Sequence, residues 1–511
     1  MEKRISHKRS NIQLLGLFTA PLFGMAIYLL LPDTYQNSQG QIVQFAHAGK
    51  ITAATGVWMA IWWITEAIPV YATALLPIAL LPATGAASIK QACTPYGHEL
   101  IFLFMGGFIL ALSMQRWELH KRISFFVLRL VGTRPNNIIA GFMGITAVLS
   151  MWVSNTATAV MMLPIAMSVI DLVISKENNS PENTQYHMPE NDTKQNFSIC
   201  LMLGIAYSAS IGGIGTLIGT PPNLFMASYI KNNLGIEISF VKWMSVGLPL
   251  VVVFIPIVWL LMTRVLYPVQ NIRIKGGAAF AKSAYQKLGH MTLGEWITFI
   301  VFIMAASLWI FRPLLAKIEW NGLRIFSGMT DTGIAIVVAL ALFVIPVDIK
   351  KQVFAMNWET AVKLPWGLLI LFGGGLSLAA SIKANGVGEL IGNQVHGFSG
   401  MHSIFIVMSV SAIIIFLTEL SSNTATTATL IPVLAAIASG MGFHPLHLIV
   451  PATISASCAF MLPVATPPNA IVFGAGYVTI PQMCKAGLWI NIIGILLITG
   501  LTYAIAIPLL L

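Results

Sequence analysis

Charged residues are scarce in this sequence. Asp, Glu, Lys and Arg make up 9% of its 511 residues, whereas hydrophobic residues make up 57%. Soluble domains carry about a quarter of their residues as charges, so this composition excludes an ordinary soluble protein. Apolar stretches long enough to cross a bilayer recur from end to end, and only short polar links separate them. We therefore expect a polytopic membrane protein of the all-α class, without a sizeable soluble domain.

Cysteine is scarce too, and the chain lacks several patterns that would indicate catalysis. Its four cysteines show no metal-type spacing, so we expect neither a disulfide framework nor a zinc site. The apolar stretches contain no nucleophile with a base, which argues against an enzyme. The glycines at 212–219 are not followed by the Lys-Ser or Lys-Thr of a phosphate loop, so they indicate close helix packing and not ATP binding. The net charge of +10 comes from basic loops, which we interpret as topology signals and not as a nucleic-acid surface.

What the sequence does contain is a polar motif that occurs twice within apolar surroundings. Residues 154–158 read Ser-Asn-Thr-Ala-Thr, and the same five residues recur at 422–426. A second motif follows each copy: residues 219–223 read Gly-Thr-Pro-Pro-Asn and residues 465–469 read Ala-Thr-Pro-Pro-Asn. Two motifs in the same order suggest that the chain is duplicated.

The spacing of the motifs supports a duplication. From Ser-Asn-Thr to Pro-Pro is 67 positions in the first half and 45 in the second, and the polar stretch 175–196 has the 22 residues of this difference. Two Gly-Gly pairs lie upstream, with Gly106 and Gly373 located 48 and 49 positions before their Ser-Asn-Thr motifs. Three landmarks in one order predict two structural repeats. We assign no role to 175–196.

The basic residues predict the orientation of the chain. Residues 1–10 carry four of them before the first apolar run at 14–31, so the N-terminus is expected in the cytoplasm. Residues 51–87 are either one over-long helix or two spans with a tight turn, and the charge pattern favours two spans. The segment 117–131 is amphipathic and suits an interfacial helix or a solvated connector. Counting the membrane spans from the cytoplasmic N-terminus places the C-terminus outside the cell.

Each repeat is expected to hold a re-entrant helical hairpin and a broken helix. The hairpins are predicted at 136–170 and 402–442, with the Ser-Asn-Thr motifs at their tips, and the broken helices at 197–231 and 446–475, interrupted at the prolines. An odd number of spans separates the repeats, so their topologies are inverted. Non-helical backbone at membrane depth is tolerated where it lines a cavity. This arrangement predicts a binding site of the secondary-transporter type near the membrane midplane.

The chemistry of such tips selects an anion. The returning half-helix exposes N–H groups and its positive dipole end. The side chains of Asn155, Thr156, Asn423 and Thr424 add hydrogen bonds, so carboxylate oxygens are held without a buried Arg or Lys.

Oxygen atoms at the same turns suit cations. Carbonyl and side-chain oxygens can form a cage for sodium in each half, and two cations would neutralise a dianion. The candidate cage residues are Ser150, Asn155 and Gly219 in the first half, and Thr418, Asn423 and Ala465 in the second. Glu419 is the only charge in the second hairpin; cation coordination and a structural or paired role are both open.

At these residues the chain resembles a known family, the divalent-anion/sodium symporters of the INDY type, in particular bacterial sodium-dependent dicarboxylate transporters. Besides the doubled motifs, the resemblance includes Trp-Trp-Ile-Thr-Glu-Ala-Ile-Pro at 62–69 and Leu-Phe-Gly-Gly-Gly at 371–375, and it covers nearly the whole chain. It implies a homodimer in which a scaffold domain holds a transport domain that moves like an elevator. It also implies that the two sodium sites are the cages named above, and that the substrate is faced by Asn155, Thr156, Asn423, Thr424 and Pro467.

These observations define the expected organisation and function. We expect the scaffold at residues 1–98 and 241–364. We expect the transport part at residues 99–240 and 365–511, the second of which also contains the last span. The expected function is sodium-coupled symport of C4 dicarboxylates such as succinate, malate and fumarate across the inner (plasma) membrane. The alternatives are sodium-independent exchange of dicarboxylates, and sodium-coupled transport of citrate or sulfate. No organic cofactor and no nucleic-acid partner are expected.

Overall fold

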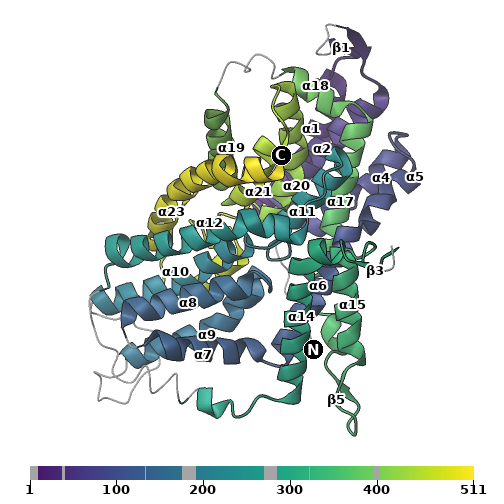
Figure 1. Cartoon of the computed structure of the whole chain (residues 1–511). Coiled ribbons are helices and arrows are strands. Elements are labelled where there is room, and N and C mark those ends of the chain that lie inside the picture. The colour runs from purple at the N-terminus through teal and green to yellow at the C-terminus, as the bar shows by residue number, and fades with distance from the viewer. Residues whose placement is uncertain are drawn as a thin grey trace, which may run out of the picture.

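The computed structural model of the protein is almost entirely helical (Figure 1). It describes residues 10–36, 41–132, 134–174, 192–269, 283, 285–320, 323–394 and 402–511. Within these ranges, seven helices are long and apolar enough to cross a membrane. The short strands form three two-stranded antiparallel hairpins in the links, so the predicted all-α class describes the spans but not every link.

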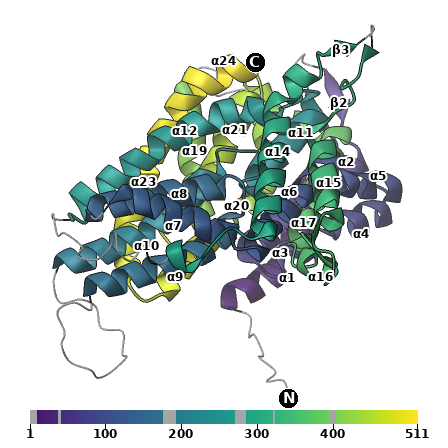
Figure 2. The same cartoon turned by 60° about the horizontal axis from the view of Figure 1, so that its bottom comes forward.

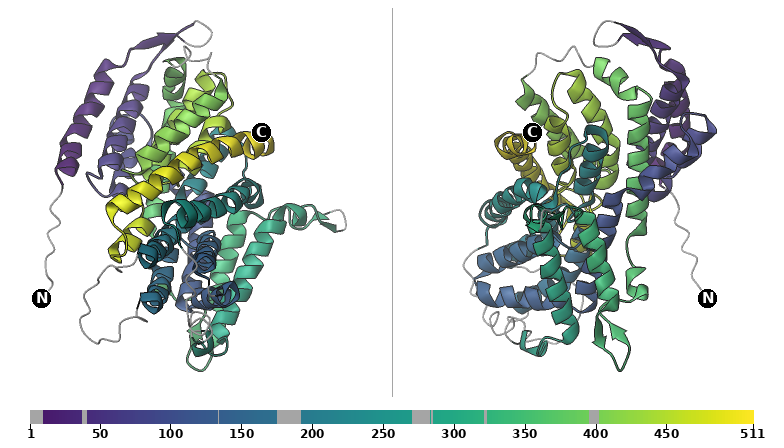
Figure 3. Two further views of the ribbon diagram at one scale, coloured as in Figure 1. Left: turned by 90° about the vertical axis from the view of Figure 1, so that its left-hand side faces the viewer. Right: turned by 45° about the vertical axis from the view of Figure 1, so that its right-hand side comes forward.

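The N-terminal helices lie at one side of the molecule. Their bounds are α1 Asn11–Leu30, β1 Thr34–Gln36, β2 Ile42–Gln44, α2 His47–Thr65, α3 Val70–Thr73, α4 Leu76–Ala83, α5 Ile89–Cys93, a 3-10 turn Thr94–Gly97 and α6 Glu99–Arg116. The helices α1 and α2 run side by side and are joined through β1 and β2 (Figure 3). The second span expected within 51–87 is not one helix. Pro77 has no N–H to donate to the carbonyl of Thr73, so the helix is split into α3 and α4.

The first hairpin and the first broken helix follow. Their elements are α7 Leu119–Val131, α8 Pro135–Ser150, α9 Asn155–Ile174, α10 Asp192–Gly213 and α11 Pro221–Leu234. The predicted amphipathic helix is α7, and the predicted hairpin is α8 and α9, which pack beside α10. The first residues of α10 belong to the stretch 175–196, which is therefore not entirely a loop; residues 175–191 lie outside the described part.

The second half repeats this order after a set of connecting helices. The connecting elements are α12 Phe240–Leu260, a π-helix Leu261–Leu266, α14 Leu293–Leu315, β3 Glu319–Trp320, β4 Leu323–Arg324, α15 Asp331–Val344, β5 Pro346–Asp348, β6 Val353–Phe354 and α16 Trp358–Ala361. The second repeat then contains α17 Trp366–Ala384, α18 Val387–Gln394, α19 Ser403–Thr418, α20 Asn423–Gly440, α21 Leu446–Ala456 and α22 Pro467–Gly474. The chain ends with α23 Ile480–Leu501, a π-helix Thr502–Ala506 and α24 Ile507–Leu510.

The breaks in the two broken helices lie upstream of the prolines. The helix α10 ends at Gly213 and α21 ends at Ala456, whereas the proline pairs occupy the first two positions of α11 and α22. Proline suits the first turn of a helix, because the N–H that it lacks would have no partner there. The prolines thus begin the second half-helix, and the non-helical segments are 214–220 and 457–466.

The Gly-Gly pairs allow two helices to pack closely. A Cβ on Gly106 of α6 would lie 2.7 Å from the backbone of Ala335 on α15, and one on Gly374 of α17 would meet the backbone of Ala74. Figure 2 shows α6, α14 and α15 together. Gly373, the reference glycine of the second pair, is packed closely too, because a Cβ there would meet the ring of Tyr96.

A buried ion pair fastens the amphipathic helix α7 to α14. Arg122 Nε donates to Glu295 Oε1 at 2.7 Å, and the side chains are 8% and 7% exposed. The guanidinium group also donates to the backbone carbonyls of residues 288–290. The pair thus holds α7 and the start of α14 together.

The variant Arg122→Met is expected to lower the free energy of unfolding by about 3–5 kcal/mol, because it leaves the carboxylate of Glu295 buried without its partner. Thermal unfolding of the detergent-solubilised protein measures this effect. The matched control is Lys121→Met, which removes an exposed ion pair with Glu118 and is expected to cost less than about 1 kcal/mol. Adding Glu295→Gln to Arg122→Met should recover part of the loss. Equal stability of the Arg122→Met and Lys121→Met variants would contradict this account.

Candidate functional site

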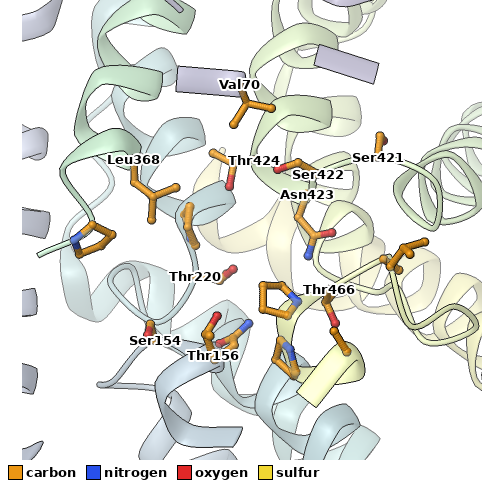
Figure 4. Close-up of a pocket in the computed structure, with 18 of the residues that line it drawn as sticks. Val70, Ser154, Thr156, Thr220, Leu368, Ser421, Ser422, Asn423, Thr424 and Thr466 are labelled. Carbon is orange, nitrogen blue, oxygen red and sulfur yellow. The ribbon is translucent and has the colours of Figure 1, made fainter. Parts of the chain in front are cut away.

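Both hairpin tips and both helix breaks line one cavity of about 980 Å³. Figure 4 shows Ser154 and Thr156 of the first tip facing Ser422, Asn423 and Thr424 of the second across it. The cavity brings together all five predicted substrate residues, which are Asn155, Thr156, Asn423, Thr424 and Pro467. Gly219 and Ala465, predicted for the cation cages, also line it.

Oxygen atoms gather around Asn155 at the first tip. Ser150 Oγ lies 2.6 Å from the carbonyl oxygen of Ala209 and 2.7 Å from the side-chain Oδ1 of Asn155. The same atom of Asn155 lies 3.0 Å from Ala209 O and 3.3 Å from Gly219 O. If the amide is turned so that its nitrogen occupies this position, the nitrogen donates to all three neighbours. With the amide oxygen there, four oxygen atoms come together, and oxygen is the type of ligand that hard cations prefer.

The second tip repeats this geometry. Thr418 Oγ1 lies 2.7 Å from Asn423 Oδ1 and 3.1 Å from the carbonyl oxygen of Ala456. Thr418 stands where the first repeat has Ser150, and Ala456 stands where it has Ala209. The hydroxyl and amide oxygens of both predicted cages are therefore arranged alike, and neutral oxygen atoms of this kind suit a sodium ion.

The asparagine that ends each Pro-Pro-Asn motif has a structural role that sequence reasoning missed. Asn223 Nδ2 donates to the carbonyls of Gly213, Ile214 and Thr216 at 3.2, 3.2 and 2.8 Å. Asn469 Nδ2 donates to the two corresponding carbonyls of residues 459 and 462 at 3.1 and 3.0 Å. Both side chains are fully buried. Each Nδ2 thus holds its unwound segment in a fixed shape, while each Oδ1 is buried and accepts no hydrogen bond from the described residues.

A further doubled motif lies at the carbonyl oxygens that the two cage hydroxyls contact. Residues 208–210 and 455–457 both read Ser-Ala-Ser, and each contains at its centre the carbonyl that the cage hydroxyl contacts. The serine hydroxyls are buried and have no partner within the described part of the chain. This fourth doubled landmark would have located the carbonyl oxygens of Ala209 and Ala456.

Four half-helices begin at the cavity, but they offer different donors. The helices α11 and α22 begin with two prolines, which lack N–H groups, so they contribute mainly their positive dipole ends. The helices α9 and α20 begin at Asn155 and Asn423, which have both backbone N–H and side-chain donors. An anion in the cavity would therefore be held chiefly by the two hairpin tips.

The cavity contains few charges. Of the residues that line it, Glu66 and Lys363 are the only acidic and basic ones, and both are exposed. Residues 10, 12 and 13 at the start of α1 also belong to the lining, so the cavity opens on the side where α1 begins. The inner part has only neutral hydrogen-bonding groups for an anion, as the sequence predicted.

The two repeats differ in how their tips are covered. Trp152 at the first tip packs among Phe240, Phe302 and Trp309, with ring centroids 5.8, 5.1 and 6.4 Å away. Leu420, its equivalent at the second tip, is 69% exposed. The two unwound segments differ in the same way: Ile218 in the first is 4% exposed, whereas its equivalent Val464 in the second is 81% exposed. The first repeat is therefore closed against its neighbours while the second is open.

A polytopic helical fold in which two hairpins and two broken helices enclose one cavity of low charge defines a membrane transporter. Comparison with known proteins gives the family. The chain matches the family described as "Sodium:sulfate symporter transmembrane region" over residues 20–511, and it belongs to this family. The resemblance predicted from the motifs is thereby confirmed.

Curated relatives match over nearly their full length. The chain is 40% identical over 507 residues to the sodium-dependent dicarboxylate transporter SdcS of Staphylococcus saprophyticus, covering 99% of this chain and 93% of that protein. It is also 40% identical over 492 residues to SdcS of Staphylococcus aureus strain USA300, covering 96% and 91%.

Solved structures with little sequence identity share the fold. The YdaH transporter of Alcanivorax borkumensis superposes with a TM-score of 0.57 at 12% identity, covering 96% of this chain and 98% of that one. The efflux pump MtrF of Neisseria gonorrhoeae superposes with a TM-score of 0.60 at 11% identity, covering 97% and 95%. These similarities show the fold alone.

Proposed function

We propose that this protein is a sodium-coupled symporter of C4 dicarboxylates such as succinate, malate and fumarate. The observation that carries the proposal is the matched pair of hairpin tips around one cavity, each with an oxygen cluster beside neutral hydrogen-bond donors. The 40% identity to the SdcS proteins, which are named sodium-dependent dicarboxylate transporters, supports the proposal. Bound cations would offset the charge of the dianion, which the inner cavity does not neutralise with any Lys or Arg of its own.

The roles of the residues follow from their positions. The amides and hydroxyls of Asn155, Thr156, Asn423 and Thr424 donate hydrogen bonds to the carboxylates, and the ring of Pro467 contacts the carbon chain. One sodium ion binds among Ser150, Asn155 and Gly219, and the other among Thr418, Asn423 and Ala465. Each asparagine thus connects an anion to a cation, so that binding of either one favours binding of the other.

The proposed movement is that of an elevator, in which the two hairpins and broken helices slide against a scaffold. We assign α12 to the moving part, although its residues fall in the 241–364 segment expected in the scaffold. Trp243 Nε1 donates to Ile214 O and Trp259 Nε1 donates to Asn136 O, both at 2.9 Å. The helix α12 is thus bound to the unwound segment of the first broken helix and to the start of α8. The helices α1, α2, α14 and α15 would form the scaffold. We add α17 to it, although its residues fall in the 365–511 segment expected in the transport part, because α17 packs against α2 and α3. Two chains would pair through the scaffold.

The proposed location is the plasma membrane, with the N-terminus in the cytoplasm and the C-terminus outside. The basic residues before α1 support this orientation. Because the cavity opens on the side where α1 begins, the structure then corresponds to the inward-open state.

Uptake of labelled succinate into proteoliposomes is expected to require an inward sodium gradient. Replacing external sodium by choline should reduce uptake to the level of protein-free liposomes, because the dianion then enters the site without compensating cations. Unlabelled malate and fumarate should compete with succinate, whereas citrate and sulfate should not. Liposomes preloaded with succinate provide the control for exchange. Uptake that depends on preloading and not on sodium would favour the exchanger, and competition by citrate or sulfate would favour those substrates.

A further inference from the structure

Glu419 makes an unusual set of contacts for a charged residue inside a membrane protein. It follows Thr418 at the end of α19, and it is 4% exposed. Its Oε1 accepts hydrogen bonds from the backbone N–H groups of Phe460 and Met461 at 2.7 and 2.9 Å, and its Oε2 accepts from Met461 and Leu462 at 3.0 and 3.1 Å. The carboxylate therefore binds the backbone of the unwound segment between α21 and α22.

A fifth contact connects Glu419 to the C-terminal helix. Asn491 Nδ2 on α23 donates to Glu419 Oε1 at 2.8 Å. Within the described residues, no Lys, Arg or His forms an ion pair with Glu419. A buried charge is costly unless it is paired or fully hydrogen-bonded. Here N–H dipoles supply the hydrogen bonds, and among the residues that the structure describes no side chain supplies the opposite charge.

The first repeat has no counterpart of this carboxylate. Met151 occupies the equivalent position, next to Ser150. The unwound segment of the first repeat is held by Thr216, whose hydroxyl donates to the carbonyl of Met151, and by Trp243, whose indole donates to the carbonyl of Ile214. The two repeats therefore arrange their cage hydroxyls and amides alike, and each holds its unwound segment through the asparagine of its Pro-Pro-Asn motif. The further contacts of the unwound segments differ, and only the second repeat has a carboxylate next to its cage hydroxyl in the chain.

We propose that Glu419 is a positioning residue of the second cation site, and that it makes this site bind sodium more tightly than the first. The proposal rests on the proposed function. By binding three consecutive peptide N–H groups, Glu419 fixes the segment that leads to Ala465, and with it the direction of the carbonyl at the cage. Its charge, next to Thr418 in the chain, attracts the cation. The second site is thus formed before substrate arrives, whereas the first is completed by the substrate-bound tip.

Sodium-induced thermal stabilisation tests this proposal without a transport assay. The purified protein is heated in detergent without dicarboxylate over a range of NaCl concentrations, with choline chloride keeping the ionic strength constant. For Glu419→Gln, the sodium concentration that gives half of the stabilisation should rise by about 10- to 100-fold, the usual loss when a group that orients a metal ligand is removed. The matched control is Met151→Leu at the equivalent position, which should leave the sodium titration unchanged.

The variant Glu419→Asp separates the effect of the negative charge from the effect of the side-chain length. It keeps the negative charge but shortens the side chain, so a smaller shift than that of Glu419→Gln is expected. Should Glu419→Gln fail to fold, Asn491→Ala removes one of the five hydrogen bonds, and it should shift the titration in the same direction by a smaller factor. A folded Glu419→Gln, or in its place a folded Asn491→Ala, with the wild-type sodium titration overturns the proposal.

Failure of the proposed function gives a different result. If sodium does not stabilise the wild-type protein and does not drive succinate uptake, sodium coupling itself is wrong. If the wild type responds to sodium and Glu419→Gln responds identically, only the role of Glu419 is wrong.

Discussion

Substituting Asn155 or Asn423 by alanine is expected to abolish sodium-dependent uptake. Each side chain contacts a cage hydroxyl, and in the proposed complex it also donates to the substrate. A hydrogen bond to a charged group contributes about 1.5–3 kcal/mol. Losing one contact to the anion and one to the cation should therefore lower uptake at limiting substrate by roughly 100-fold or more. Labelled succinate uptake into proteoliposomes measures the effect.

Expression and thermal stability of these variants should stay close to the wild type when sodium is absent, because both side chains face the cavity. The control variant Asn232→Ala replaces an exposed asparagine at the end of α11, where its side chain contacts His98. It should transport normally. Wild-type uptake by Asn155→Ala and Asn423→Ala would refute the assignment of the site.

Gly219→Ala is expected to remove transport by a different route, through the backbone of the first break. A Cβ at Gly219 would lie 2.5 Å from the carbonyl oxygen of Gly213 and 3.0 Å from its carbonyl carbon. Since these are backbone atoms within a packed segment, the segment itself has to move, and the carbonyl of Gly219 moves away from Asn155. Sodium-dependent uptake should fall to background, with a loss of about 1–3 kcal/mol in the free energy of unfolding, as for other overpacked sites.

Gly144→Ala serves as the matched control, because a Cβ there meets no atom within 4 Å. Gly144 lies on α8 of the first hairpin, in the same repeat as Gly219 but outside the unwound segment, so this control adds the same methyl group where it meets no packed backbone. Gly144→Ala should transport as the wild type does, with equal or slightly greater stability because alanine favours a helix. Normal uptake by Gly219→Ala would show that the position of this carbonyl does not matter for coupling.

Much of the architecture could be predicted because it follows from composition and repetition. The Ser-Asn-Thr motifs interrupt segments without charge, and a polar tip inside the membrane has few alternatives to a hairpin. The structure has hairpins at both places, with their tips at one cavity. The spacing of the doubled motifs carried this prediction, since it related residues far apart in the chain.

Other features depended on tertiary contacts that no local pattern reveals. The division of α3 from α4 depends on Pro77, yet Pro164 and Pro432 lie inside continuous helices. The breaks were placed at the prolines, whereas they lie upstream, where Asn223 and Asn469 bind the freed carbonyls. An asparagine that organises backbone looks the same in a sequence as one that binds a ligand.

The contacts of Glu419 could not be predicted from the sequence either, because they too are tertiary contacts. Its partners are backbone groups about forty residues further along the chain and a side chain on the last long helix. Backbone donors have no sequence signature, so the residue was recognisable only as an unexplained charge in the membrane. Its role required the shape of the unwound segment.

The unequal covering of the two tips bears on the energetics of the transport cycle. If the cavity changes sides, Leu420 and Val464 leave water while Trp152 and Ile218 enter it. Burying one such side chain contributes about 1.5–3 kcal/mol, so the gain at one repeat offsets the loss at the other. In the proposed cycle, this contribution to the free energy therefore favours neither end state strongly, and the ion gradient would set the direction of transport.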